Sequence, residues 1–97
     1  METLLLLEKW YLAQCDGDWE HQYGIQIGTL DNPGWTLKVD LSGTEAEGRS
    51  LEPVQIKRTD SDWIHYQVET KQFQAFMGPR NLAEGIEAFL AWIRDSS

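Results

Sequence analysis

The amino-acid sequence predicts one α+β domain, in which an N-terminal and a C-terminal helix pack on one face of an antiparallel sheet of about five strands. Three observations lead to this fold class. Apolar residues recur at helical spacing near both ends of the chain, whereas in between they alternate with polar residues. The chain has 97 residues, a size typical of one domain. No linker or repeat divides residues 1–97, so we treat them as a single domain.

Residues 3–14 are predicted to form the first helix. One side of this helix, at 3.6-residue spacing, carries Leu4, Leu7, Trp10, Tyr11 and Gln14. Gly17 follows closely and is a common helix terminator.

Residues 19–30 change to a period of two, which predicts the first strand, with Tyr23, Ile25 and Ile27 on one face. The segment Asp31–Gly34 predicts a turn, because Pro33 fixes φ for the first central position and Gly34 can adopt positive φ at the second. Residues 35–41 alternate again, so the two strands should form a hairpin with one buried face.

Residues 42–52 are polar and contain glycine, which predicts a loop. Further strands are expected around Val54 and Ile56, over Trp63–Thr70, and around Phe73, Ala75 and Met77, with turns at Asp60–Asp62 and Lys71–Gln72.

The C-terminal segment has the clearest helical pattern. Its apolar stripe contains Leu82, Ile86, Phe89, Leu90 and Ile93. Asn81, followed three residues later by Glu84, predicts a capping box at its start.

Charge is unevenly distributed along the chain. Sixteen acidic residues against eight basic ones give a net charge of −8. Between residues 16 and 48 the acids are opposed only by Lys38; they are Asp16, Asp18, Glu20, Asp31, Asp40, Glu45 and Glu47. Nucleic-acid binding requires clustered Lys and Arg, which the pair Lys57–Arg58 does not supply, so a basic protein partner is the better expectation. The alternative is that the charge serves solubility alone.

Membrane insertion and secretion are not expected. The apolar run Leu4–Leu7 is far shorter than the roughly 20 residues that a membrane span requires. The residues around it do not fit a secretory signal, and the single cysteine agrees with a reducing compartment. We therefore expect a cytoplasmic protein.

The stretch CDGDWEHQYG, residues 15–24, raises the question of a metal or catalytic site. A calcium loop counted from Asp16 would need a glutamate at its twelfth position, where Ile27 stands. Zinc would need paired nitrogen or sulfur ligands, and the spacing of Cys15, His21 and His65 does not provide them. No cofactor or metal is therefore expected.

Two other functions remain open. Cys15 could act with His21 as a nucleophile in sulfur transfer or hydrolysis, although its acidic surroundings do not favour a thiolate. An aromatic ligand pocket near Trp19, Tyr23 and Trp35 is the other alternative.

Several short motifs stand out between residues 10 and 35; they are Gly17-Asp18-Trp19-Glu20-His21, Tyr23-Gly24 and Thr29-Leu30-Asp31-Asn32-Pro33-Gly34-Trp35. With these motifs, residues 10–35 resemble the immunity protein 53 family of bacterial polymorphic toxin systems. The resemblance continues through Trp63 and Phe89-Leu90-Ala91-Trp92. It implies a small, non-enzymatic cytoplasmic protein that binds and neutralises a cognate toxin domain. It carries over no catalytic or contact residues.

A surface for this partner is inferred from the residues themselves. Nuclease toxins are one class with basic surfaces, which an acidic protein with aromatic anchors could cover. Trp19 and Trp63, each beside acids, are predicted to be exposed anchors, and Trp10, Trp35 and Trp92 to belong to the core. For Trp19, burial in the core remains the alternative. The predicted partner-binding residues are Asp16, Asp18, Trp19, Glu20, His21, Glu45, Glu47 and Trp63.

Overall fold

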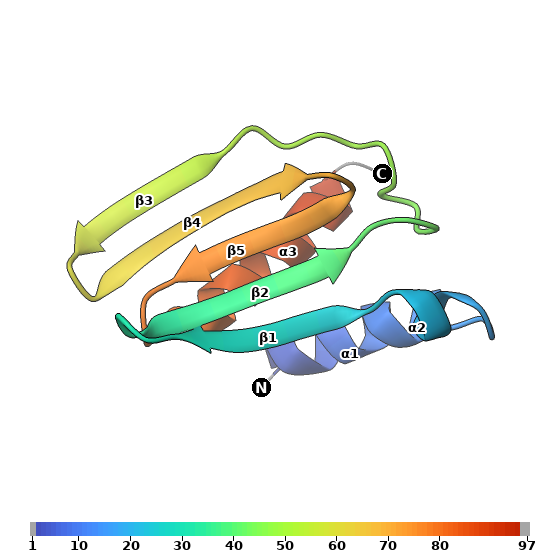
Figure 1. The fold of residues 1–97 in the computed structure, drawn as a ribbon, viewed down its shortest axis with the longest axis horizontal. Helices are drawn as coiled ribbons and strands as arrows, with labels where there is room; N and C mark the ends of the chain where they lie inside the picture. The colour runs from blue at the N-terminus through green and yellow to red at the C-terminus, as the bar shows by residue number, and fades with distance from the viewer. Residues whose placement is uncertain (1, 96–97) are drawn as a thin grey trace.

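The computed structural model describes residues 2–95 and contains one layer of sheet and one layer of helices (Figure 1). The elements, in chain order, are α1 (Glu2–Gln14), α2 (Trp19–Gln22), β1 (Ile25–Leu30), β2 (Gly34–Asp40), β3 (Val54–Thr59), β4 (Asp62–Glu69), β5 (Gln72–Met77) and α3 (Leu82–Asp95). The sheet order is β1-β2-β5-β4-β3, and every neighbouring pair is antiparallel. The predicted fold class is confirmed.

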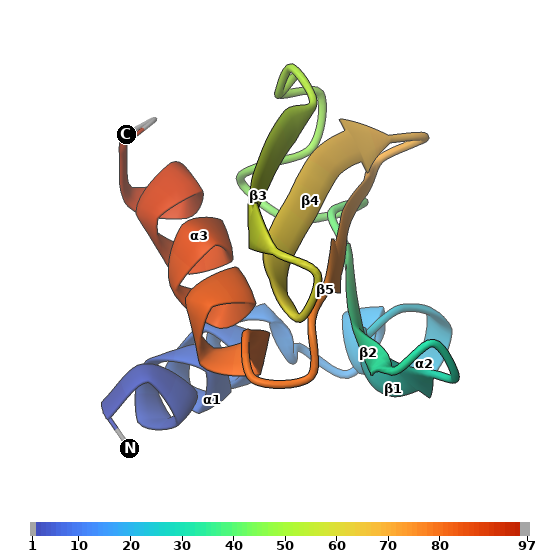
Figure 2. The same ribbon diagram turned by 90° about the vertical axis from the view of Figure 1, so that its left-hand side faces the viewer.

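The helices α1 and α3 lie on the same side of the sheet (Figure 2). The strand register places Leu37 opposite Ala75 and Val39 opposite Phe73 on the side that faces them. Directly paired residues of antiparallel strands share a face, so these side chains form one apolar layer. Phe89 of α3 is fully buried against this layer, and its ring packs edge-on against Trp10 of α1 with centroids 5.0 Å apart. The core therefore lies between the sheet and the two long helices.

The prediction of a strand from Trp19 is wrong, because residues 19–22 form the short helix α2 and β1 begins only at Ile25. The carboxylate of Asp16 accepts hydrogen bonds from the backbone N–H groups of Asp18 and Trp19, both at 3.0 Å. These bonds satisfy donors that a strand would have offered to a neighbouring strand. Side-chain capping thus overrides the alternating pattern.

The expectation of positive φ at Gly34 is also wrong. Gly34 is the first residue of β2 and has no positive φ, whereas the β4–β5 turn has positive φ at Thr70 and Lys71. A β-carbon on Gly34 would collide with the carbonyl oxygen of Met77 in the neighbouring strand. Glycine is required here by the close approach of two backbones.

Helix α3 begins directly after Asn81, as predicted, but the side chain of Asn81 does not form the expected capping box. Its Nδ2 donates to Asp62 at 2.9 Å and to Glu84 at 3.0 Å, and its Oδ1 accepts from the backbone N–H of Trp63. Asn81 is 7% exposed. It therefore ties the start of α3 to the start of β4.

Candidate partner-binding surface

One end of the molecule gathers carboxylates from four parts of the chain. We call it the acidic end, and its residues are Asp16, Asp18, Glu20, Asp40, Glu45, Glu47 and Glu69. Figure 1 shows why they meet: α2, the end of β2, the loop after β2 and the β4–β5 turn all lie at the same end of the sheet. The five acids predicted to bind a partner, Asp16, Asp18, Glu20, Glu45 and Glu47, all lie at this end, whereas Asp31 lies at the opposite end of the sheet. Asp40 and Glu69 were not among the predicted partner-binding residues. The position of Glu69 depends on strand pairing, because Glu69 is paired with Gln72 across a turn.

Two of these acids cap the α1–α2 connection. Asp16 accepts the bonds described above, and Glu20 accepts from the backbone N–H of Asp16 at 3.0 Å and of Gly17 at 2.9 Å. The N–H groups of Trp19 and then Asp18 lower the pKa of Asp16. The pKa of Glu20 is lowered by its own backbone N–H and by those of Asp16 and Gly17. Both side chains therefore stay ionised to lower pH than free carboxylates do.

The loop acids also have partners within the chain. Glu45 accepts a hydrogen bond from the indole N–H of Trp10 at 3.0 Å. Glu47 accepts from the backbone N–H of Gly43 at 2.8 Å and from the ammonium of Lys71 at 3.2 Å, and these contacts lower its pKa in that order. These hydrogen bonds hold the loop in place.

Asp18 and Glu69 differ from the other acids. Both are exposed, and neither side chain makes a hydrogen bond or an ion pair with any part of the chain from residue 2 to residue 95. His21 is also exposed, on α2. At this end, Asp18 and Glu69 are therefore the acids that a partner could engage without competing with internal contacts.

The prediction that Trp19 is an exposed anchor is wrong. Its side chain is 5% exposed, and its indole N–H donates to the carbonyl oxygen of Ser42 at 2.8 Å. Its ring also packs edge-on against Trp10, with centroids 6.2 Å apart. Trp19 joins α2, the loop after β2 and α1, so it supports the acidic end from beneath.

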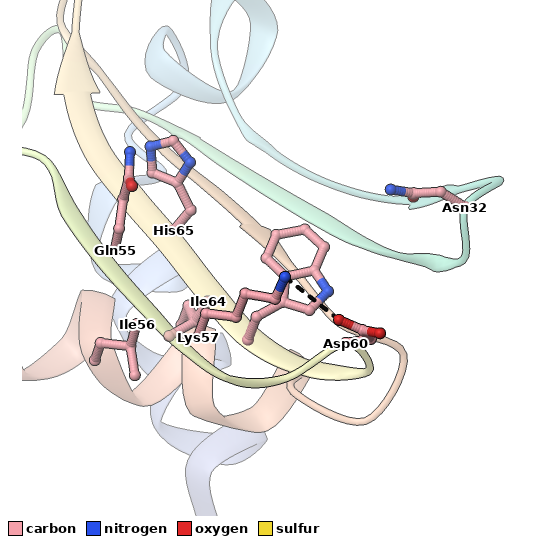
Figure 3. A pocket seen from close by; sticks show the side chains of 8 residues that line it. Asn32, Gln55, Ile56, Lys57, Asp60, Ile64 and His65 are labelled. Atoms are coloured by element: carbon pink, nitrogen blue, oxygen red, sulfur yellow. Dashed lines mark ion pairs between the residues drawn. The ribbon is translucent and has the colours of Figure 1, made fainter.

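Trp63 lies at the other end of the sheet, near the start of β4 (Figure 1). It is partly exposed on the sheet face opposite the helices, where it lines a shallow groove beside the β3–β4 hairpin. Figure 3 shows that Gln55, His65 and Lys57 line this groove, with Asn32 across it. The same face carries Phe76, whose ring is 6.2 Å from that of His65. The alternating pattern of β5 implied an outward Phe76, although only its inward residues were singled out.

The alternative sites predicted from the sequence are not assembled. The Cys15 thiol donates to the carbonyl oxygen of Tyr11 at 3.4 Å, and within residues 2–95 it has no hydrogen bond to His21. Trp35 is the second residue of β2, at the end remote from Trp19, and its indole N–H donates to the carbonyl oxygen of Pro79 at 2.9 Å. The aromatic pocket is therefore absent from the described part of the chain.

Two further features concern the described residues 2–95 only. No three or more His, Cys, Asp or Glu side chains among them are grouped in a way that could hold a metal ion. None of the helices that they form has the length and apolar character needed to cross a bilayer.

The family model described as Immunity protein 53 matches residues 4–94, which include every helix and strand apart from the first two residues of α1 and the last of α3. Searches of curated proteins and of solved structures find no match. The matched segment covers nearly the whole chain, so the resemblance seen in the sequence is confirmed. The protein belongs to the immunity protein 53 family, and membership implies an immunity protein that binds a cognate toxin.

Proposed function

We propose that this protein neutralises its cognate toxin domain by covering a basic toxin surface with the acidic end. The observation that carries the proposal is the gathering of seven carboxylates from separate parts of the chain, with Lys71 already bound to Glu47. Arg49, from the same loop, reaches away to α3 and donates to the carbonyl oxygen of Trp92 at 2.6 Å. The end therefore keeps a strong negative potential, which speeds encounter with a cationic partner.

The toxin class that best fits this surface is one that holds phosphates, such as a nuclease of a polymorphic toxin system. Such a toxin needs Lys and Arg at its active surface, and an acidic protein can occupy them. Neutralisation then requires binding alone, so we infer that the protein is not an enzyme. We also infer that it acts in the bacterial cytoplasm, where such a toxin would meet its nucleic-acid substrate.

Asp18 gives the cleanest test of the acidic end, because its side chain has no partner in residues 2–95 that a substitution would remove. Asp18→Lys and Glu69→Lys should each slow association with the cognate toxin domain, by about two- to tenfold at low salt. They should also weaken the dependence of the association rate on ionic strength. Stopped-flow measurements at two ionic strengths would provide both quantities.

Glu87→Lys is the matched control. Glu87 is exposed on α3, in the helix layer and outside both the acidic end and the groove at Trp63, and the substitution changes the net charge equally while removing only an exposed hydrogen bond from Thr3. Circular dichroism would show that each variant is folded. If all three variants showed the same rates and the same salt dependence, the toxin would not contact the acidic end. Glu20→Lys is unsuitable as a probe, because it would also remove the caps of the α1–α2 connection.

A further inference from the structure

Helix α1 presents apolar side chains to solvent as well as to the core. Its inward side buries Leu7 and Trp10, as an amphipathic helix should. Its outward side, however, carries Leu5, 61% exposed, and Leu12, 71% exposed. Four of the remaining large apolar side chains that are exposed in residues 2–95 lie on α1 or β1 nearby; they are Leu4, Leu6, Tyr11 and Ile27. Such a concentration is unusual for a protein that stays unpartnered.

The outward side of α1 also carries one charge of each sign. Leu5 and Leu12 are seven residues apart and therefore lie on the same side of the helix, two turns from each other. Glu8 lies on one flank of this leucine pair and Lys9 on the other flank. Both are exposed, and neither makes a hydrogen bond or ion pair with residues 2–95. We call Leu5, Glu8, Lys9 and Leu12 the outer α1 face.

The geometry points to a second copy of this chain as the occupant of the outer α1 face. We propose that two copies pair through parallel α1 helices, about a two-fold axis that runs along them. Leu5 then packs on Leu5 of the second copy, and Leu12 on Leu12. Glu8 of each helix then lies beside Lys9 of the other, so the two-fold axis produces two attractive Glu8–Lys9 pairs. An antiparallel pair would instead set Glu8 beside Glu8 and Lys9 beside Lys9, which repels.

The size of this face sets the strength of the pairing. A helix of 13 residues is about 20 Å long and about 10 Å wide. Its contact area is therefore well below the roughly 800 Å² per partner of a standard interface. The dimer should be weak and should form in a concentration-dependent manner. The acidic end is made of other residues, so dimerisation does not rest on the proposed toxin contact.

Sedimentation velocity over a range of protein concentrations tests whether Leu5 and Leu12 form the dimer contact. Wild-type protein should shift from monomer to dimer as concentration rises. Leu5→Glu and Leu12→Glu should each keep it monomeric. Ile56→Glu is the control, since Ile56 is a 38% exposed side chain on β3, away from α1. A wild-type protein that stays monomeric, or an Ile56→Glu variant as impaired as Leu12→Glu, would overturn the proposal.

Charge reversal tests the parallel arrangement. Glu8→Lys alone and Lys9→Glu alone should each weaken self-association by about tenfold, because two attractions become repulsions. An equimolar mixture of these two variants should associate at least as well as wild type, since each lysine then meets a glutamate. The double variant with both reversals should also recover. Single reversals that pair as well as wild type would rule out the parallel arrangement, and a mixture that stays monomeric would rule out the pairing.

The toxin could instead occupy the outer α1 face, and the same variants distinguish toxin binding there from dimerisation. Leu12→Glu protein should still bind and neutralise the toxin if the face serves only self-association. Loss of toxin binding in folded Leu12→Glu protein, together with a monomeric wild type, would assign the face to the toxin and overturn the dimer.

Discussion

Gly34 is a position in the sheet where the neighbouring backbone leaves no room for a β-carbon. An added β-carbon would meet the carbonyl oxygen of Met77, and that backbone is held in the ladder between β2 and β5. We expect Gly34→Ala to lower the free energy of unfolding by about 1–3 kcal/mol through this overlap. Gly24→Ala is the control, because a β-carbon there has no neighbour within 4 Å. Equal melting temperatures for the two variants would show that the strands can separate without loss.

Substitution of Cys15 tests whether the function of the protein requires a thiol. The Cys15 thiol donates a weak hydrogen bond to the carbonyl oxygen of Tyr11 and also interacts with the Tyr11 side chain, and a serine hydroxyl can make hydrogen bonds of the same kind. We expect Cys15→Ser to protect cells from the toxin as well as wild type does. Growth of cells that express the toxin measures this. Loss of protection by a folded Cys15→Ser protein would revive the enzyme alternative.

At the scale of elements, a charged network joins α3 to the β3–β4 hairpin. Arg58 donates to Glu84 at 2.6 Å and to Asp62 at 2.8 Å, and Asn81 bonds both acids. The hydrogen bond from Arg58, followed by that from Asn81, lowers the pKa of Glu84 below its ordinary value of 4.5. The network fixes where α3 begins, and thereby which face of α3 covers the sheet.

This network predicts how stability depends on pH. The folded pKa of Glu84 is lower than the unfolded one, so the unfolded chain takes up protons first as pH falls. The stabilisation by Glu84 should therefore be complete above about pH 5 and should disappear as pH falls through the folded pKa. Urea unfolding from pH 7 to pH 3 should show a smaller loss of stability for Glu84→Gln than for wild type. Glu87→Gln, on the same helix but outside the network, should lose as much as wild type; equal curves for all three would exclude this role.

At the scale of the whole molecule, the acidic end and Trp63 lie at opposite ends of the uncovered sheet face. A toxin of ordinary size could contact both, because six residues of β4 span only about 20 Å. We propose that the toxin footprint extends along this face to Trp63. Trp63→Ala should then speed dissociation of the complex without changing the salt dependence of association, since an apolar contact acts after encounter. An unchanged dissociation rate would confine the footprint to the acidic end.

The features that depend on local pattern could be predicted from the amino-acid sequence. The helical spacing at both ends and the alternation between them predicted the two-layer fold. The motifs around Trp19 and Trp35 indicated the family. Each of these signals is carried by residues close together in the chain, so it can be read without knowing what packs against them.

Which side chains are buried and which are exposed could be known only from the tertiary structure. Trp19 has acidic neighbours in the sequence, yet it is buried because α1 and the loop after β2 close around it. Leu5 and Leu12 are apolar, yet they stay exposed because α1 uses its other side to meet the core. Burial depends on contacts between segments far apart in the chain, and a local sequence pattern cannot predict these contacts. For the same reason, the sequence did not predict that Glu69 belongs to the acidic end. Strand pairing places the β4–β5 turn at the same end of the sheet as α2 and the loop after β2.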